Sequence, residues 1–456
     1  MSGRVRTDFD VLIVGGSLAG CTTATLYGRR GLRVAVLERK PDIDAYKVIC
    51  AHFLQAGARP MLRRHGFAEK IEAAGAVRNH FHMWTRYGWV RPEPEDYGYT
   101  LRRQVLDPLV RRTAAETPGV ELLLGYTAQD LIWSDGRAIG VEAVTRDGER
   151  HAIRARLVVA ADGRESRVAR MARVPGRVLP HNRFTYSAYV RGLPRPYDDA
   201  AFGYLLDPDC ALVEPCDDDL TLVVAVPHKS RLPEFKKDVE GAWLRYIEAL
   251  PDAPPIRDAE RASKFIGKVD MPNVQRPAVG NSVAFVGDAA VTSDPIWAVG
   301  CGWAFQESEW LVGATSGPLL DRRDLTQGLA RYRRRLAFEI TGHHVMGSKY
   351  SSGRPFSVFE KLLFSAGARD PMFANHLHTF VTRSYPAHEF LTPRTLALAI
   401  KALAAPRLGV PQQVVERETG EVGIPMNGDL DAMLSTAAGL PTPGDPGASE
   451  SALPAA

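Results

Sequence analysis

A glycine-rich turn between a short apolar run and a helix-compatible stretch most constrains what this chain can fold into. Residues 10–14 read DVLIV, residues 15–20 read GGSLAG, and residues 18–30 suit a helix. A strand, a tight turn and a helix in this order present backbone N–H groups and a helix N-terminus to a pyrophosphate. A second apolar run ends on Glu38, 18 residues after Gly20. A carboxylate at about that spacing bonds ribose hydroxyls, so the sequence predicts a dinucleotide-binding fold.

The residues of this turn have separate roles. Gly15 permits the tight turn, and Gly20 lets the helix pack against the strand. Ser17 stands where a glycine normally lets the backbone approach the pyrophosphate, which is a departure from the pattern. The residues that we expect to contact the dinucleotide here are Gly15, Ser17, Leu18, Ala19, Gly20, Glu38 and Arg39.

Two further motifs carry a resemblance to a known family. Residues 157–166 read LVVAADGRES, and residues 283–290 read VAFVGDAA and are followed by Pro295 and Gly300. With the first turn, in this order and spacing over residues 10–315, they resemble the FAD-dependent class A flavoprotein monooxygenases, which include the aromatic hydroxylases. Flavin halogenases and prenyl reductases belong to the same superfamily.

The resemblance implies noncovalent FAD and assigns further residues to it. Asp288 would bind the ribityl hydroxyls, and a helix from about Gly302 would point its N-terminus at the N1–C2 edge of the flavin. Arg103 matches by position a family arginine that contacts the cofactor, or else it is a surface arginine at a helix start. Cys50 is read as a small packed residue rather than a site of covalent attachment. The other contacts expected from the resemblance are Asp162, Gly163, Gly287, Pro295, Val299, Gly300 and Cys301.

The chain also departs from the family pattern. Ala298 stands where the family usually has glycine, and Gly302 stands where aromatic hydroxylases commonly have asparagine. Val291 stands where those enzymes often have histidine. Residues 294–300 are closer to the halogenase branch, but the Trp-x-Trp-x-Ile-Pro motif of that branch does not occur. Residues 77–84, where a halogenase lysine is expected, contain no lysine. These features disfavour halogenation.

The expected fold class is α/β. It comprises a glutathione-reductase-type Rossmann FAD-binding domain with a β-meander, an inserted β-sheet substrate domain and C-terminal helices. We expect the FAD-binding domain to use residues 1–175 and 276–320, and the substrate-covering sheet residues 176–275. A helical region at 321–435 and a disordered tail at 436–456 complete the predicted organisation.

The family resemblance implies a monooxygenase with a role in secondary metabolism. Such an enzyme transfers one oxygen atom from a flavin C4a-hydroperoxide to a hydrophobic aromatic or polyene molecule, by hydroxylation or epoxidation. Electrons come from NAD(P)H docked near Asp162 and Arg164, or from flavin reduced by a separate reductase. No catalytic residue is assigned, since the cofactor and O2 carry the chemistry. The aromatic residues that can line the pocket, or else pack in the core, are Phe81, Tyr186, Phe202 and Trp297.

Three alternatives stay open beside the monooxygenase. They are a prenyl or polyene reductase, a halogenase-like enzyme, and a flavin-binding sensor without turnover. Oxygen consumption during turnover separates the oxygenase from the reductase, and a sensor would hold FAD that no electron donor cycles.

Composition narrows the partners. The 57 basic and 53 acidic residues nearly balance at a formal charge of +4, and the short basic runs indicate solvated helix faces rather than a nucleic-acid surface. The five cysteines and the histidine pairs complete no ligand pattern, so we expect no metal and a cytoplasmic protein. No segment has the length of a membrane span, and residues 394–407 could at most rest on a membrane surface.

Overall fold

The computed structural model describes residues 4–93, 97–194 and 200–404. Internal contacts divide the chain into one unit of residues 1–406 and another of residues 407–456. The expected tail at 436–456 and the end of the expected helical region, 405–435, lie outside the described residues.

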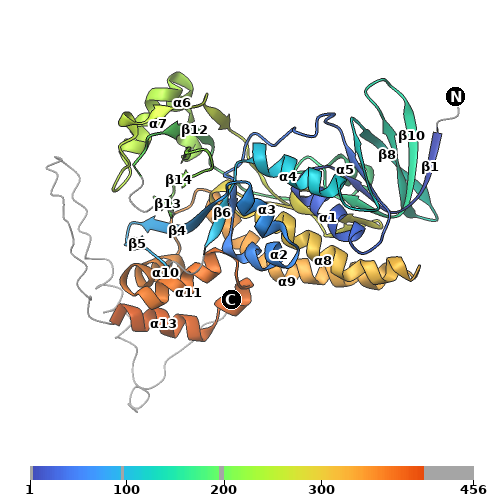
Figure 1. Cartoon of the computed structure of the whole chain (residues 1–456). Coiled ribbons are helices and arrows are strands. Elements are labelled where there is room, and N and C mark those ends of the chain that lie inside the picture. Colours follow the sequence, from blue (N-terminus) through green and yellow to red (C-terminus); the bar gives the residue numbers. More distant parts are fainter. Residues whose placement is uncertain (1–3, 94–96, 195–199, 405–456) are drawn as a thin grey trace, which may run out of the picture. The chain divides into compact units, whose positions relative to one another are not determined.

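A parallel sheet forms the frame of the first unit (Figure 1). Its strands in spatial order are β20 (Val283–Phe285), β10 (Arg150–Ala160), β1 (Arg4–Val14), β2 (Val34–Glu38) and β7 (Val120–Leu124). Every residue of β2 is buried, as expected for a parallel sheet covered on both faces. The helix α1 (Leu18–Gly28) connects β1 to β2, which confirms the predicted dinucleotide-binding unit.

The predicted β-meander is present. The strands β8 (Thr127–Ser134) and β9 (Arg137–Val144) run antiparallel into β10. Residues 120–124 are not part of it, because they form β7 and pair in parallel with β2. The connection through α4 (Arg103–Ala115) explains this, because a helix crossover returns the chain in the parallel direction.

The three sequence motifs meet at one edge of the parallel sheet. Val14 pairs with Ala160, and Ala160 pairs with Phe285, so the three strands end side by side. A Cβ built on Gly20 would lie 1.8 Å from the Gly15 carbonyl oxygen. A Cβ on Gly15, whose φ is +112°, would lie 2.3 Å from the Ala161 oxygen. Only glycine permits this approach of α1 to the two turns.

The second sheet contains strands that precede residue 176 in the chain as well as strands that follow it. Residue 176 is where we expected the substrate-covering sheet to begin. The strands of the second sheet in spatial order are β16 (Glu260–Arg261), β12 (Thr185–Arg191), β15 (Thr221–Val226), β14 (Cys210–Pro215), β13 (Ala200–Leu205), β4 (Val77–Thr85), β6 (Gly98–Thr100) and β3 (Phe53–Leu54). β5 (Gly88–Val90) pairs with β4, and β17 (Ile266–Lys268) pairs with β12. β3, β4 and β6 precede the segment to which we assigned the substrate-covering sheet.

The two faces of this sheet contact different helices (Figure 1). One face packs against α6 (Leu232–Lys237) and α7 (Val239–Glu248). The other face packs against α10 (Val358–Arg369), α11 (Pro371–Val381) and α13 (Pro393–Ala404). Side chains therefore alternate between two separate apolar clusters along each strand.

Further helices complete the described part of the chain. The helix α8 (Gly300–Leu320) packs on α1, and α9 (Thr326–Ser351) packs on α8 (Figure 1). The remaining helices are α2 (Arg59–Arg64), α3 (Phe67–Ala73), α5 (Arg167–Met171) and α12 (Ala387–Phe390). A small sheet of β11 (Arg177–Leu179), β18 (Asn273–Gln275) and β21 (Val291–Thr292) lies where the chain enters and leaves the second sheet. Among the described residues, no helix is both long and apolar enough to cross a membrane.

Substitution of glycine by alanine should have opposite effects on the free energy of unfolding at Gly20 and at Gly313. Gly20→Ala should lower the free energy of unfolding by about 3 kcal/mol, because the new methyl group meets backbone. Gly313→Ala, at an exposed position of α8 where a Cβ meets nothing, should raise it by about 0.5–1 kcal/mol. Urea unfolding of the FAD-loaded chain measures both, and wild-type stability in Gly20→Ala contradicts the observed packing.

Candidate cofactor and substrate site

The first turn presents free backbone donors beside a fixed carboxylate. Ser17 precedes α1 without capping it, and the first turn of α1 contains no acidic residue. Glu38 Oε2 accepts the Gly16 N–H at 2.7 Å, and Oε1 accepts the Lys40 N–H at 2.9 Å. Arg39 lies exposed beside it. The N–H groups that begin α1 can therefore bind a pyrophosphate, with the Glu38 carboxylate held at the end of β2 for a ribose.

One face of α4 carries a network of three charged residues. Arg103 donates to Asp107 Oδ1 at 2.6 Å and to Ser17 Oγ at 2.9 Å. Arg111 donates to the Gly16 oxygen at 2.9 Å and to the Ala45 oxygen at 2.7 Å. All three side chains are buried. Sequence reasoning named Arg103 alone, although the repeat of four residues along a helix could have indicated the other two.

The Gly287–Asp288 turn is held by residues that the sequence did not indicate. Gly287 N–H donates to the buried Glu307 at 2.6 Å. Lys47 Nζ forms an ion pair of 2.8 Å with Asp288. Burial opposes ionisation of Asp288, yet the Lys47 ammonium outweighs it and lowers the pKa of this carboxyl. No local pattern marked Lys47, since it lies in a loop without secondary structure.

The helix α8 begins at Gly300, two residues earlier than the sequence predicted. Val299 precedes it, and no side chain caps its first N–H groups. Ala298 has a φ of 48°, which explains why the family usually has glycine at this position. The positive end of a helix of 21 residues is therefore available to an electron-rich group.

The turn before α8, η5 (Pro295–Trp297), is fixed by a buried ion cluster. Asp294 Oδ1 accepts the Ile296 N–H at 2.9 Å. Asp294 Oδ2 lies 3.1 Å from His181 Nε2 and 3.2 Å from Arg183 Nη1. These partners lower the pKa of Asp294 even though burial acts to raise it. The ionised carboxylate thus holds the segment that the resemblance places beside the flavin.

Two cysteines lie together at the start of α8. Cys50 Sγ is 3.6 Å from Cys301 Sγ, and the Arg103 guanidinium lies 3.7 and 3.9 Å from the two sulfurs. A hydrogen bond from Cys301, aided by Arg103, lowers the pKa of Cys50, and the same interaction raises the pKa of Cys301. From the sequence we expected a cofactor contact for Cys301 and a packed position for Cys50, but no contact between them.

The Asp162–Gly163 segment lies at the expected edge of the sheet but uses its side chain locally. Asp162 accepts a hydrogen bond from the Ser166 hydroxyl at 2.5 Å and another from the Val168 N–H at 3.0 Å. These bonds fix the turn before α5. Gly163 has a φ of +85°, and a Cβ there would meet nothing within 4 Å. The backbone of this segment is thus open to a ligand.

The four aromatic residues expected in the pocket pack in two different clusters, one on each face of the second sheet. Phe81 and Trp297 pack in the cluster that faces the C-terminal helices. Tyr186 and Phe202 pack in the cluster beneath α6 and α7, where Tyr186 stacks on Phe235 at 5.7 Å. One cavity therefore does not contain all four. Trp297 is half-buried, and its ring lies 5.6 Å from Tyr350.

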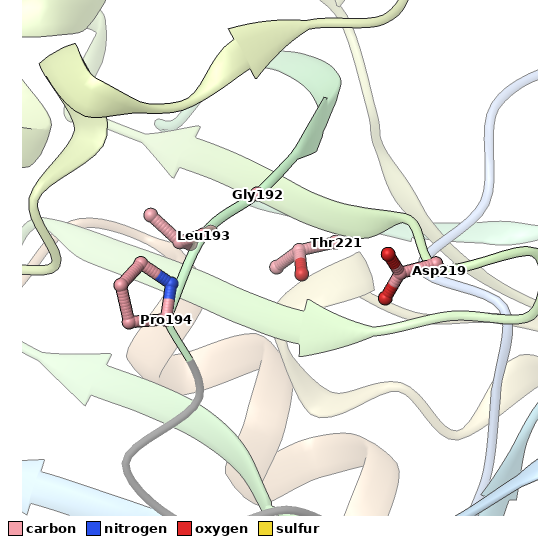
Figure 2. Close-up of a pocket in the computed structure, with 5 residues that line it drawn as sticks. All are labelled: Gly192, Leu193, Pro194, Asp219 and Thr221. Atoms are coloured by element: carbon pink, nitrogen blue, oxygen red, sulfur yellow. The ribbon is translucent and has the colours of Figure 1, made fainter.

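Two other observations limit the site. Within residues 4–93, 97–194 and 200–404, no group of three or more potential ligands could hold a metal ion. A pocket is lined by Gly192, Leu193, Pro194, Asp219 and Thr221, with no expected cofactor residue among them (Figure 2). The residues around α1, α4 and α8 fit FAD better: two uncapped helix starts suit its pyrophosphate and flavin edge, and Glu38 suits its ribose.

Glu38→Ala should weaken FAD binding by about 1.5–3 kcal/mol, the range for hydrogen bonds to a charged group. Titration of FAD into apoprotein, prepared by acid release of the flavin, measures the change and also tests that the flavin is noncovalent. Glu116→Ala, an exposed residue at the end of α4, is the control and should bind FAD like wild type. Equal affinity in Glu38→Ala and wild type removes Glu38 from the site.

Comparison with known proteins gives a family and several relatives. Residues 8–314 match the FAD binding domain family. Digeranylgeranylglycerophospholipid reductase 1 of Methanopyrus kandleri is 29% identical over 303 residues, which cover 63% of this chain and 75% of the reductase. The flavin-dependent brominase Bmp2 has a TM-score of 0.72 at 18% identity, covering 87% of this chain and 99% of the brominase.

PqsL of Pseudomonas aeruginosa, described as a probable FAD-dependent monooxygenase, has a TM-score of 0.63 at 20% identity, covering 80% of this chain and 98% of PqsL. The two solved structures share the fold, which confirms the expected α/β architecture. The family match spans more than half of the chain and includes all three motifs. The chain belongs to the FAD binding domain family, and it is an FAD-dependent oxidoreductase.

Proposed function

We propose that this protein is a monooxygenase that inserts one oxygen atom into a hydrophobic aromatic or polyene molecule. The observation that carries the proposal is the apolar enclosure of η5, the turn that precedes α8. Ile296 is buried and Trp297 half-buried in a cluster that joins the second sheet to the C-terminal helices. Other members of this cluster are Met83, Leu212, Val224, Phe364, Phe373 and Leu377. Oxygen transfer requires a site from which water is excluded.

The residues of the chain would bind and orient FAD. Glu38 and the start of α1 hold the adenosine and pyrophosphate, and the start of α8 stabilises negative charge on the flavin. FAD, when bound, supplies the reduction of O2 and the transfer of one oxygen atom. Arg103 keeps Ser17 and the two cysteines in place between these helices. Electrons come from NAD(P)H or from a separate flavin reductase.

A second candidate function is the reduction of a carbon–carbon double bond in a prenyl or polyene chain. Two observations favour it. The Cys301 thiol, hydrogen-bonded to Cys50, places an exchangeable proton at the start of α8, and reduction of a double bond needs a proton beside the hydride. The reductase of Methanopyrus kandleri is also a relative of this chain over 303 residues.

Turnover under labelled O2 separates these functions. With reduced flavin and a substrate found by screening, we expect a product heavier by one labelled oxygen atom and no halogenated product in excess halide. The halide arm is motivated by the halogenase-like residues 294–300. A gain of two hydrogens without oxygen, measured by mass spectrometry, rejects the monooxygenase assignment and supports the reductase. Incorporation of halide rejects the monooxygenase assignment and supports a halogenase.

Trp297→Ala tests whether this residue encloses the reacting site. The variant should keep FAD and release more hydrogen peroxide per NAD(P)H, or per reduced flavin supplied, because a wetter site loses peroxide before oxygen transfer. Its melting temperature should also fall, since the ring packs on Tyr350. Trp133→Ala, at an exposed position of β8, is the control. Unchanged coupling with a lower melting temperature assigns Trp297 to packing alone.

A further inference from the structure

A row of residues crosses the second sheet on the face that carries the η5 cluster. Tyr189 on β12 pairs with Leu222 on β15, and Leu222 pairs with Glu214 on β14. Paired residues point to the same face, so Tyr189 and Glu214 share a face with their Cα atoms about 10 Å apart. Tyr189 packs in the same cluster as Trp297 and Phe81. Both side chains therefore lie on the side of the sheet where we place the substrate.

His52 determines what the Tyr189 hydroxyl can do. His52 lies two residues after Cys50 and is buried. Its φ of 63° is a strained conformation for a residue other than glycine. Its Nδ1 accepts the Arg103 backbone N–H at 3.1 Å, and its Nε2 is hydrogen-bonded to Tyr189 Oη. Burial lowers the pKa of His52, so the ring is neutral.

The tautomer of His52 follows from these contacts. A neutral imidazole that accepts at Nδ1 carries its proton on Nε2. The Nε2–H therefore donates to Tyr189 Oη, and the hydroxyl proton of Tyr189 is left to donate to a third group. Tyr189 is only partly buried, so that third group can come from outside the protein.

Glu214 provides a second hydrogen-bond donor on the same face. Asn79 donates to Thr100 Oγ1, and Thr100 Oγ1 donates to Glu214 Oε1 at 2.7 Å. Burial raises the pKa of Glu214 well above its usual value and thereby favours the protonated carboxyl group. Because Oε1 accepts from Thr100, the proton of that form lies on Oε2. Among the described residues Oε2 is buried and has no hydrogen-bond partner.

The charges nearby indicate which acceptor fits these donors. Arg102 is paired with Asp217 at 2.8 Å, and Arg103 is paired with Asp107 at 2.6 Å. The two arginines whose charges act on His52 are thus each paired with a carboxylate. The face offers neutral donors, which suit a neutral oxygen acceptor better than a carboxylate.

We propose that Tyr189, oriented by His52, and Glu214 form a two-donor site that binds a carbonyl oxygen of the substrate. The proposal rests on the proposed function in one respect, since it places the substrate against this face of the sheet. It narrows the substrate class to aromatic or conjugated molecules that carry a carbonyl group, and it disfavours a plain hydrocarbon chain. Tyr189 and Glu214 are binding residues, and His52 is a positioning residue.

Equilibrium binding of two matched probes tests the site without turnover. The FAD-loaded full chain is titrated with 2-acetylnaphthalene and with 2-ethylnaphthalene, and the change in the visible absorbance of bound FAD gives each Kd. Wild type should bind the acetyl probe about tenfold more tightly, as expected for a hydrogen bond to a donor otherwise left unpaired. Tyr189→Phe should lose most of this preference.

Tyr186→Phe is the matched control, because Tyr186 lies on the same strand but points to the opposite face. It should keep the wild-type preference. Glu214→Gln should also keep it, since an amide N–H replaces the acidic proton as donor. Retention of wild-type FAD absorbance and melting temperature shows that each variant is folded.

The proposal is overturned if wild type binds the two probes equally or binds neither, or if Tyr189→Phe keeps the preference. A stronger preference in Glu214→Gln overturns the protonated state of Glu214, because it would mean that the native group is an ionised acceptor. These readings do not depend on oxygen incorporation. Failure of the labelled-O2 experiment with an intact probe preference would therefore reject the monooxygenase and leave the two-donor site.

Discussion

The parallel pairing of β10 with β1 is the constraint on which the cofactor site depends. Val14 stands opposite Ala160, so the turns that follow these strands begin side by side. The start of α1 reaches both turns only because Gly15 and Gly20 have no side chains. Segments almost three hundred residues apart thereby share one edge of a sheet, where strand ends and helix starts collect the donors that an anionic cofactor needs.

Two successive arginines at the start of α4 connect this edge to the second sheet. Arg102 binds Asp217, in the turn between β14 and β15, through its backbone N–H and its guanidinium at 2.8 Å. Arg103 binds Ser17 and Asp107 on the cofactor side. Both side chains are buried, so the loss of a carboxylate partner would leave a desolvated charge. The first turn of α4 thus couples the position of the second sheet to that of the turn before α1.

Much of the cofactor site could be predicted from the sequence, because each motif is a local pattern of strand, turn and helix. The residues that would face the substrate could not be predicted in this way. Tyr186 and Phe202 belong to strands with ordinary aromatic content, and only the register of the sheet decides which face each one occupies. Lys47 and His52 lie in irregular backbone, where no periodicity marks them, and they act through partners more than 130 residues away.

The sequence by itself determined the dinucleotide fold, the glycines at its turns and the carboxylate at the end of β2, since each belongs to a local pattern of strand, turn and helix. Tertiary structure alone decided the start of α8 at Gly300, the contact between Cys50 and Cys301, and the raised pKa of Glu214. Each depends on what surrounds a group after folding. Burial and neighbouring charge set whether a side chain is ionised, and no spacing along the chain encodes them.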